Sequence, residues 1–186
     1  MNTEYIALLR GINIGGHQVK MDQLRTLFGE LGFDQVRSYI QTGNVFFGSK
    51  EQDKRTLRTK IEEHLRTSLG YAVATCLRTR GELEALVSLD PFHGIQVTPD
   101  TRLAVTFFTE PVLETVSIPY LTPDKAYEVI GMTSTELFVV WHLNNGRPGN
   151  SYGFLEQKFK IPATTRFWHT TANILAAAKN VKVNKT

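Results

Sequence analysis

A glycine-rich loop between residues 10 and 20 is the part of this sequence best suited to bind an anion. Gly11, Gly15 and Gly16 follow an apolar run and precede a helical pattern. Glycine lets backbone N–H groups point outward without an obstructing Cβ atom, and a helix N-terminus favours negative charge. The candidate binding groups of this loop are Arg10, Asn13, Gly15, Gly16, His17 and Lys20. The spacing matches neither GxxxxGKS/T nor GxGxxG, so a tight connection that needs glycine is the alternative interpretation.

A second polar stretch, residues 38–44, carries more hydrogen-bonding side chains than a hairpin requires. Ser38, Gln41 and Asn44 are candidate ligand-binding residues, because hydroxyl and amide groups can donate to phosphate and carboxylate oxygens. The alternative is turn chemistry, since Gly43-Asn44 is typical of a two-residue hairpin turn. We expect the second strand to run antiparallel to the first, which would place the hairpin tip at the opposite end of the sheet from the glycine-rich loop.

The third candidate lies at residues 164–169, where we expect the last helix to begin with Thr164 or Thr165 as its N-cap. A cation at a helix N-terminus opposes the helix dipole unless negative charge lies nearby, so Arg166 is a candidate site residue. Trp168 joins the candidate set, with packing as its alternative role. We hypothesise that Arg10 and Arg166 hold one external anion. The competing interpretation pairs each arginine with an internal carboxylate.

Recognisable catalytic and metal-binding patterns are missing from the sequence. The single cysteine, Cys76, excludes an internal disulfide and a CxxC motif, and we expect it to be a small buried side chain. The five histidines show neither HxxxH nor HExxH spacing, so we expect no metal site. No GxSxG motif, Ser/His/Asp order or carboxylate pair stands out. Catalytic residues, reaction and cofactor are therefore left unassigned.

Composition and charge limit the classes of partner. Of 186 residues, 41% are hydrophobic, which is enough for a packed core. No apolar run approaches the roughly 18 residues of a membrane span, and the N-terminus lacks a signal pattern, so we expect a cytoplasmic protein without membrane association. Lys179, Lys182 and Lys185 together account for the formal net charge of +3. Nucleic-acid contact is therefore expected to be weak, non-specific and confined to this lysine tail.

Hydrophobic periodicity in the first half predicts a strand, a helix, a hairpin, a second helix and a strand. Residues 5–9 form a continuous apolar run, and residues 21–31 repeat at helical spacing. The hairpin covers residues 36–47, and Ser49-x-x-Gln52 reads as a capping box for a helix that ends at Gly70. Residues 71–79 form the following strand. This order predicts a ferredoxin-like, or split βαβ, unit over residues 1–79.

The second half, residues 80–186, contains a less regular set of elements. We expect a short helix at 81–89, a strand at 103–108, a hairpin of strands 127–132 and 136–142, and helices at 151–160 and 167–179. Seven strands and five helices in this order favour an α+β protein. The prediction is two duplicated ferredoxin-like halves packed together, with the C-terminal helices and the basic tail in the second half.

Several segments carry a family resemblance. They are Ala7-Leu8-Leu9-Arg10-Gly11-Ile12-Asn13-Ile14-Gly15-Gly16, residues 36–45 (VRSYIQTGNV), Pro91-Phe92 and, after a thinner stretch, Thr164-Thr165-Arg166. In these segments the chain resembles the domain-of-unknown-function 1697 family. The resemblance implies a bacterial-type cytosolic protein with a duplicated ferredoxin-like architecture and no established activity. Phe167 and His169 flank Trp168 where the family usually has asparagine, and the loop at residues 145–152 also departs from the family pattern.

The sequence favours one function over a second. The first is binding of a phosphate- or carboxylate-bearing small ligand at the glycine-rich loop, with no reaction assigned. The alternative is a nucleic-acid- or protein-binding module, because ferredoxin-like sheets bind RNA when aromatic side chains on an open face stack on bases. Tyr5, Tyr39, Phe46 and Phe47 are the aromatic residues such a face would use.

Overall fold

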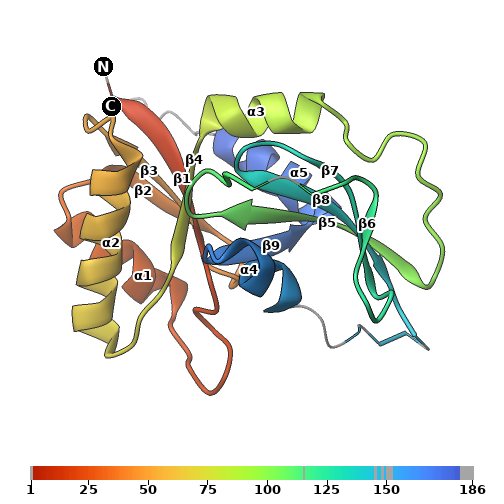
Figure 1. The fold of residues 1–186 in the computed structure, drawn as a ribbon. Coiled ribbons are helices and arrows are strands. Elements are labelled where there is room, and N and C mark those ends of the chain that lie inside the picture. Colours follow the sequence, from red (N-terminus) through yellow and green to blue (C-terminus); the bar gives the residue numbers. More distant parts are fainter. Residues whose placement is uncertain (1, 115, 145, 148, 150–152, 181–186) are drawn as a thin grey trace. The chain divides into compact units, whose positions relative to one another are not determined.

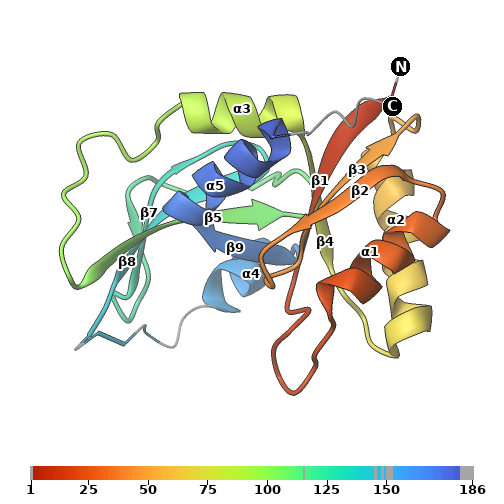
Figure 2. The same cartoon turned by 180° about the vertical axis from the view of Figure 1, so that it is seen from behind.

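The computed structural model describes residues 2–114, 116–144, 146–147, 149 and 153–180 (Figures 1 and 2). The chain forms two compact units. The first contains Met1–Ala85 and Ala172–Thr186, and the second contains Leu86–Thr171. Each unit holds one antiparallel sheet, so the predicted α+β class is confirmed. In the described part of the chain, no helix has the length and apolar character needed to cross a membrane.

The first unit is a four-stranded sheet with two helices on one face. Its elements are β1 (Thr3–Leu9), α1 (Met21–Glu30), β2 (Asp34–Tyr39), β3 (Asn44–Ser49), α2 (Lys54–Leu69) and β4 (Thr75–Thr79). The strand order is β2-β3-β1-β4. Alternate residues of β1 and β3, such as Ala7 and Phe47, share one buried core with Phe28 of α1 and Ile61 of α2. The helical repeat of apolar residues thus covers one face of the sheet.

The hairpin tip and the glycine-rich loop lie at the same end of this sheet, so the expectation of opposite ends is wrong. β1 is antiparallel to β3, with Leu8 opposite Asn44. β3 is antiparallel to β2, with Tyr39 opposite the same Asn44. β1 and β2 therefore run parallel with β3 between them, and both end where β3 begins. Because α1 connects β1 to β2, β3 can lie between these two strands and pair with both. This non-local pairing places the hairpin tip and the glycine-rich loop at the same end of the sheet.

The connection between β2 and β3 is a four-residue loop, residues 40–43, rather than the predicted two-residue turn. Ile40 and Gly43 have φ angles of 48° and 75°. Asn44 already belongs to β3, and its Nδ2 donates to Tyr39 O at 3.1 Å and to Thr42 Oγ1 at 2.9 Å. These bonds close the loop from inside, so Asn44 acts as the first residue of a strand and not as a turn residue.

The N-terminus of α2 also differs from the prediction. The N-cap is Asp53, whose carboxylate accepts hydrogen bonds from the backbone N–H groups of Arg55 and Thr56. Ser49, expected to begin a capping box, instead accepts from Glu51 N at 3.1 Å. Aspartate accepts more strongly than serine at this position because it also complements the helix dipole. The hydrogen bonds from Thr56 and Arg55 lower the pKa of Asp53.

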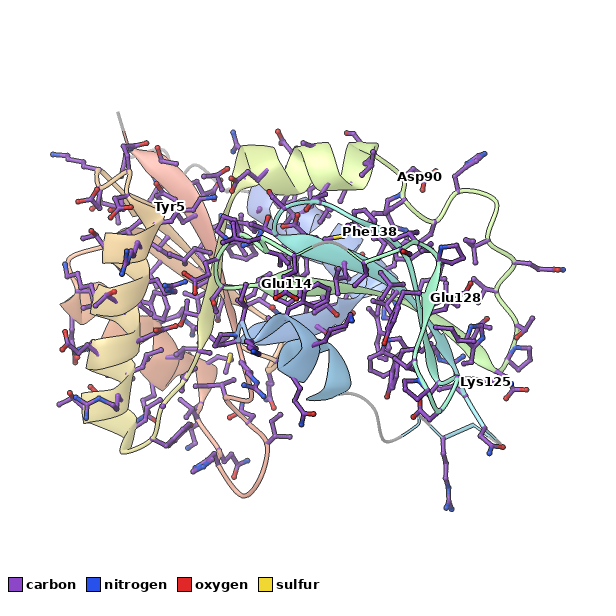
Figure 3. The ribbon with its side chains drawn as sticks, viewed as in Figure 1. Tyr5, Asp90, Glu114, Lys125, Glu128 and Phe138 are labelled. Carbon is purple, nitrogen blue, oxygen red and sulfur yellow. The ribbon has the colours of Figure 1, made fainter. Side chains whose placement is uncertain are left out.

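The second unit is built on a five-stranded antiparallel sheet of order β6-β7-β8-β5-β9. Its strands are β5 (Thr101–Phe108), β6 (Tyr120–Leu121), β7 (Tyr127–Met132), β8 (Glu136–His142) and β9 (Ala163–Phe167). Helix α4 (Phe154–Phe159) precedes β9. Helix α3 (Arg80–Ser88) begins in the first unit and ends in the second, and α5 (Trp168–Lys179) begins in the second and continues into the first. Figure 3 labels Phe138 of β8, which is buried in this unit.

Two strands of the second sheet, β6 and β9, were not predicted, and β9 changes the interpretation of Arg166. The residue lies within β9, opposite Val105 of β5, and does not begin a helix. The predicted N-cap role of Thr164 and Thr165 is therefore wrong, because these β-branched residues extend the chain alongside β5. The departures from the family pattern at Asn145, Pro148 and residues 150–152 lie outside the described residues.

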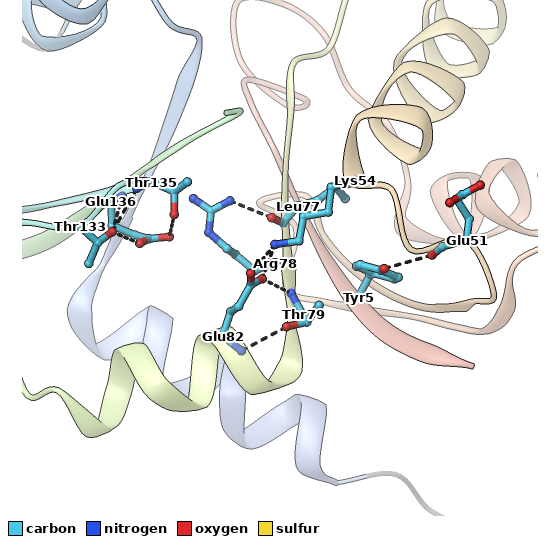
Figure 4. Close-up of polar contacts among 10 residues, drawn as sticks. All are labelled: Tyr5, Glu51, Lys54, Leu77, Arg78, Thr79, Glu82, Thr133, Thr135 and Glu136. Atoms are coloured by element: carbon cyan, nitrogen blue, oxygen red, sulfur yellow. Dashed lines mark hydrogen bonds and ion pairs between the residues drawn. The ribbon is translucent and has the colours of Figure 1, made fainter. Parts of the chain in front are cut away.

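Three of the four aromatic residues of the first sheet are buried, and the fourth, Tyr39, is half-buried. Tyr5 and Phe46 are 1% exposed and Phe47 is 0% exposed. Tyr5 stacks on Phe47 in the core below the helices, and its hydroxyl donates to Glu51 O at 3.0 Å (Figures 3 and 4). Burial, followed by the negative charge of Glu51, raises the pKa of Tyr5. Bases could not reach the rings of Tyr5, Phe46 and Phe47 without a rearrangement of the fold.

Candidate functional site

Three loops meet at the C-terminal end of β1, and we call this region the three-loop end. Its parts are residues 10–20, residues 40–43 and residues 70–74. Leu9 N–H donates to Gly43 O at 2.8 Å, and Arg10 N–H donates to Ala74 O at 2.9 Å. The backbone of β1 is therefore held on one side by the hairpin loop and on the other by the loop before β4. All three loops belong to the first unit.

Asn13 organises the glycine-rich loop through both ends of its amide. Its Nδ2 donates to Gln41 O at 2.8 Å, and its Oδ1 accepts from Val19 N–H at 2.6 Å. The first bond ties the loop to the hairpin, and the second fixes the chain just before α1. Asn13 is thus a structural tie, and in this arrangement its amide is directed at the protein backbone rather than at a ligand.

Gly15 and Gly16 supply the outward-facing backbone of the loop. Their φ angles are 67° and 89°, in the left-handed region that favours glycine. A Cβ atom at either position would meet nothing within 4 Å, so both residues face open space. Among the described residues, no acceptor takes a hydrogen bond from the N–H of Gly15 or of Gly16. Two adjacent donors are thus presented to solvent in the loop that precedes α1.

The first turn of α1 adds further donors, because Lys20 is the N-cap and makes no side-chain cap hydrogen bond. The first N–H groups of a helix have no partner within the helix, and the helix dipole places partial positive charge there. The only carboxylate of this turn, Asp22, forms an ion pair with Arg25. Lys20 is exposed, so its ammonium group is accessible at the same place.

An aromatic pair supports the glycine-rich loop. The imidazole of His17 stacks on the ring of Tyr71, with centroids 3.7 Å apart and an interplanar angle of 18°. The Tyr71 hydroxyl donates to Ile12 O at 3.1 Å, and burial raises the pKa of this phenol. His17 is exposed, so Tyr71 fixes one face of the imidazole while its edge and other face stay open to solvent.

The hairpin candidates have mixed roles. Ser38 is half-buried in β2, and its Oγ accepts from Arg25 Nη1 at 2.6 Å. Asn44 is fully buried and holds the loop closed, so it lies away from solvent. Gln41 contributes its carbonyl to the bond with Asn13, and its side chain is exposed. Of these three residues, only Gln41 presents its side chain at the three-loop end.

The remaining candidates differ in setting. Arg10 is exposed where β1 gives way to the glycine-rich loop. Arg166 belongs to the second unit and is 8% exposed, and its Nη1 donates to Thr164 Oγ1 at 2.8 Å and to Thr165 O at 3.0 Å. Trp168 is half-buried and packs edge-on against Phe92, with centroids 5.3 Å apart. Their part in a common anion site stays a prediction.

Some residues of the three-loop end were missed by sequence reasoning. Tyr71, the carbonyl of Ala74 and the exposed Ile14 and Ile40 all lie there. Tyr71 was counted as part of a strand, and β4 begins only at Thr75. No local pattern brings residues 70–74 beside residue 10, because this contact depends on β4 pairing with β1. In the described part of the chain, no group of three or more His, Cys, Asp or Glu side chains could hold a metal ion.

The charged side chains within the three loops are all positive. Residues 10–20, 40–43 and 70–74 include Arg10 and Lys20 and contain no aspartate or glutamate. The region therefore combines cations with exposed backbone donors, which is the donor set that recognises phosphate and carboxylate groups.

Comparison with known proteins agrees with this fold. The family described as "Protein of unknown function (DUF1697)" matches residues 1–138. The chain belongs to this family. No curated protein matches it. A solved structure of a conserved bacterial protein from Streptococcus pneumoniae is similar, with a TM-score of 0.65 and 24% sequence identity, over 97% of this chain and 100% of that chain. At this identity the similarity extends to the fold alone.

Proposed function

We propose that the three-loop end binds a small ligand through a phosphate or carboxylate group. The observation that carries this proposal is the pair of unbonded N–H groups at Gly15 and Gly16, in the loop that leads into the first turn of α1. Oriented backbone donors at a helix N-terminus form an anion site without further rearrangement. No general acid, base or nucleophile is assigned, so the proposal concerns binding and not a reaction.

Each group near the loop would have a distinct role in this site. The N–H groups of Gly15 and Gly16 would donate to two oxygens of the anion, and Lys20 would supply a charged donor. His17, braced by Tyr71, would donate from its ring edge. Arg10 would add long-range attraction from the other end of the loop. Asn13 would act indirectly, because it fixes the loop in the conformation that presents these donors.

Titration with inorganic phosphate and pyrophosphate, followed by amide NMR, tests the proposal. Binding should shift the amide signals of Gly15 and Gly16 more than those of any other backbone group. Lys20→Ala should weaken pyrophosphate binding by roughly ten- to 100-fold, the scale of a charged hydrogen bond. Lys50→Ala is the matched control, because Lys50 is also exposed but follows β3 at the opposite end of the sheet. Binding that leaves the two glycine amides unshifted would overturn the proposal.

A nucleic-acid-binding module is the second candidate, and the burial of Tyr5, Phe46 and Phe47 argues against stacking on the first sheet. Contact through the lysine tail stays a prediction, and Lys182 and Lys185 lie outside the described residues. Deletion of residues 181–186 removes both lysines. If each contacts one phosphate, the slope of log affinity against log salt concentration should fall by about 1.8 for duplex DNA. Salt-resistant binding that survives the deletion would favour the module instead.

We also propose that the two halves, residues 1–79 and 80–186, are duplicated ferredoxin-like units. The sub-order β7-β8-β5-β9 of the second sheet corresponds to β2-β3-β1-β4 of the first. The last strand of each half, β4 in the first and β9 in the second, is followed directly by a helix, α3 and α5 respectively. In chain order, β6 and its flanking loops lie between β5 and β7, the place that α1 has between β1 and β2. The cytoplasmic location also stays a prediction.

A further inference from the structure

Ile40, in the hairpin loop, combines two unfavourable features. Its φ angle is 48°, and its side chain is 43% exposed. A β-branched residue is strongly disfavoured at positive φ, where glycine or asparagine is the usual choice. The other described non-glycine residues with positive φ are unbranched at Cβ: Gln35, Asp90, Lys125 and Lys160. An isoleucine that is strained and also exposed to water contributes little to the stability of the fold.

Ile14 presents a second exposed apolar side chain on the neighbouring loop. It is 67% exposed, and its Cδ1 would lie 3.5 Å from a Cβ atom built on Gly11. Ile14 and Ile40 each adjoin one partner of the bond between Asn13 and Gln41, the bond that joins the two loops. The buried Ile12 fills the space between the loops, because a Cβ atom on Gly43 would lie 2.7 Å from its Cγ2.

We propose that Ile14 and Ile40 contact the apolar part of the ligand whose anionic group is held at Gly15, Gly16 and Lys20. The ligand class is then an amphipathic anion, a phosphate monoester or carboxylate that carries an alkyl or aryl group. This inference rests on the proposed function. It explains why strained isoleucine occupies a position where asparagine would relieve the strain, and the cationic side chains of the glycine-rich loop favour an anionic polar group on the ligand.

A series of alkyl phosphates tests this ligand class. Each methylene buried at the two isoleucines should tighten binding about fourfold, so hexyl phosphate should bind at least tenfold more tightly than methyl phosphate. Calorimetric titration of the full chain measures both. If neither inorganic phosphate nor acetate binds, the proposed function is wrong. If methyl and hexyl phosphate bind equally, the anion site stands and the apolar contact is refuted.

Asparagine substitutions separate the strain from the contact. Ile40→Asn should raise the midpoint of thermal unfolding by about 2–4 °C, because asparagine tolerates positive φ, and should remove much of the gain from the hexyl group. Ile14→Asn should reduce the same gain without the rise in midpoint, since Ile14 has an ordinary φ. Ile95→Asn is the control, because Ile95 is 36% exposed in the second unit and also lacks a positive φ.

These variants give distinct outcomes. Stabilisation by Ile40→Asn together with a loss of chain-length dependence supports the inference. If Ile40→Asn stabilises the protein but the affinity still rises with the length of the alkyl group as before, Ile40 is strained without contacting the ligand, and the proposed contact is refuted. The proposed contact would also be refuted if Ile95→Asn reduced the gain in affinity from methyl to hexyl phosphate as much as Ile14→Asn does. The gain would then not depend on the three-loop end.

Discussion

The side-chain amide of Asn13 joins two loops that are 28 residues apart in the sequence, because its Nδ2 donates to the carbonyl of Gln41 at 2.8 Å. The same amide accepts from Val19 N–H, so one residue sets both the closure of the glycine-rich loop and the approach to α1. The exposed N–H groups of Gly15 and Gly16 lie between Asn13 and Val19, the two points that these bonds fix. The site therefore depends on a side chain that is directed at the protein itself.

Asn13→Ala should lower the free energy of unfolding by about 1–2 kcal/mol, because it removes two hydrogen bonds, of which the one from Val19 N–H is partly buried. Urea unfolding measures this change. Hydrogen exchange at Val19 N–H should accelerate, since this amide loses its acceptor. Gln18→Ala, an exposed neighbour that makes no bond of this kind, should change neither quantity. Equal exchange at Val19 in both variants would contradict the role assigned to Asn13.

Replacement of glycine by alanine in the first unit should lower the stability at Gly15 and Gly16 and raise it at Gly29. Gly15→Ala and Gly16→Ala should each cost about 1 kcal/mol of stability, because both residues have positive φ while the space around them is open. Gly29→Ala should stabilise by about 0.5–1 kcal/mol, because Gly29 lies within α1 and its Cβ also meets nothing within 4 Å. Thermal unfolding of the three variants checks the sign. A neutral Gly16→Ala would rule out the strained backbone.

Local patterns were sufficient to predict β1 and α1. The apolar run of β1 is buried from Tyr5 to Leu9, and the helical spacing of α1 places Leu24, Leu27 and Phe28 in the core. These elements are specified by their own residues, so periodicity alone finds them. The glycine-rich loop between them was located for the same reason.

Features that depend on distant partners were not predicted. The sequence predicts the hairpin tip at the wrong end of the first sheet, because the position of the tip depends on the pairing of β3 with β1, which spans more than 30 residues. The sequence predicts a helix start where β9 lies, because the pairing of Thr164 and Thr165 with β5 spans almost 60 residues. The predicted two-residue turn is wrong for a local reason. The side-chain amide of Asn44 donates to Tyr39 O and Thr42 Oγ1, and these bonds hold Asn44 as the first residue of β3.

Glu82 gives the first unit a pH-dependent contribution to stability. It forms a capping box with Thr79, whose N–H donates to Glu82 Oε2 at 2.8 Å, and an ion pair with Lys54 (Figure 4). Burial alone would raise the pKa of Glu82, but the hydrogen bond from Lys54, the bond from Thr79 N–H and nearby positive charge outweigh it and lower the pKa below its ordinary value of 4.5.

A carboxyl group with a lowered pKa stabilises the folded state above its unfolded pKa, and this stabilisation is lost as the pH falls through the folded value. Glu82→Gln should therefore be less stable than the natural protein at pH 7, and the difference should shrink from about pH 5 downward. Urea unfolding at several pH values measures it. Thr79→Ala should cost about 1 kcal/mol throughout this range, because the hydroxyl does not titrate. A Glu82→Gln effect that stays constant down to pH 3 would exclude the charge of Glu82 as its cause.

Arg37 holds the C-terminal end of α5 to the first sheet. Its Nη1 donates to Ala177 O at 3.0 Å, its Nη2 pairs with Glu4 at 2.7 Å, and its guanidinium lies 4.8 Å from the centroid of Phe46. Arg37→Met should lower the free energy of unfolding by about 1–3 kcal/mol, since it leaves the half-buried Glu4 and the helix carbonyl without this donor. Exchange at Asn180 N–H, which donates to Ala176 O, should accelerate more than exchange in the middle of α5.

Arg80→Met is the matched control, because Arg80 also pairs with Glu4, at 3.2 Å, but is 47% exposed. This variant should lower the free energy of unfolding by less than about 1 kcal/mol. If both variants destabilise the protein equally and leave Asn180 protected, the contribution of Arg37 is its charge pair with Glu4, and the bond to the helix end is not what holds α5.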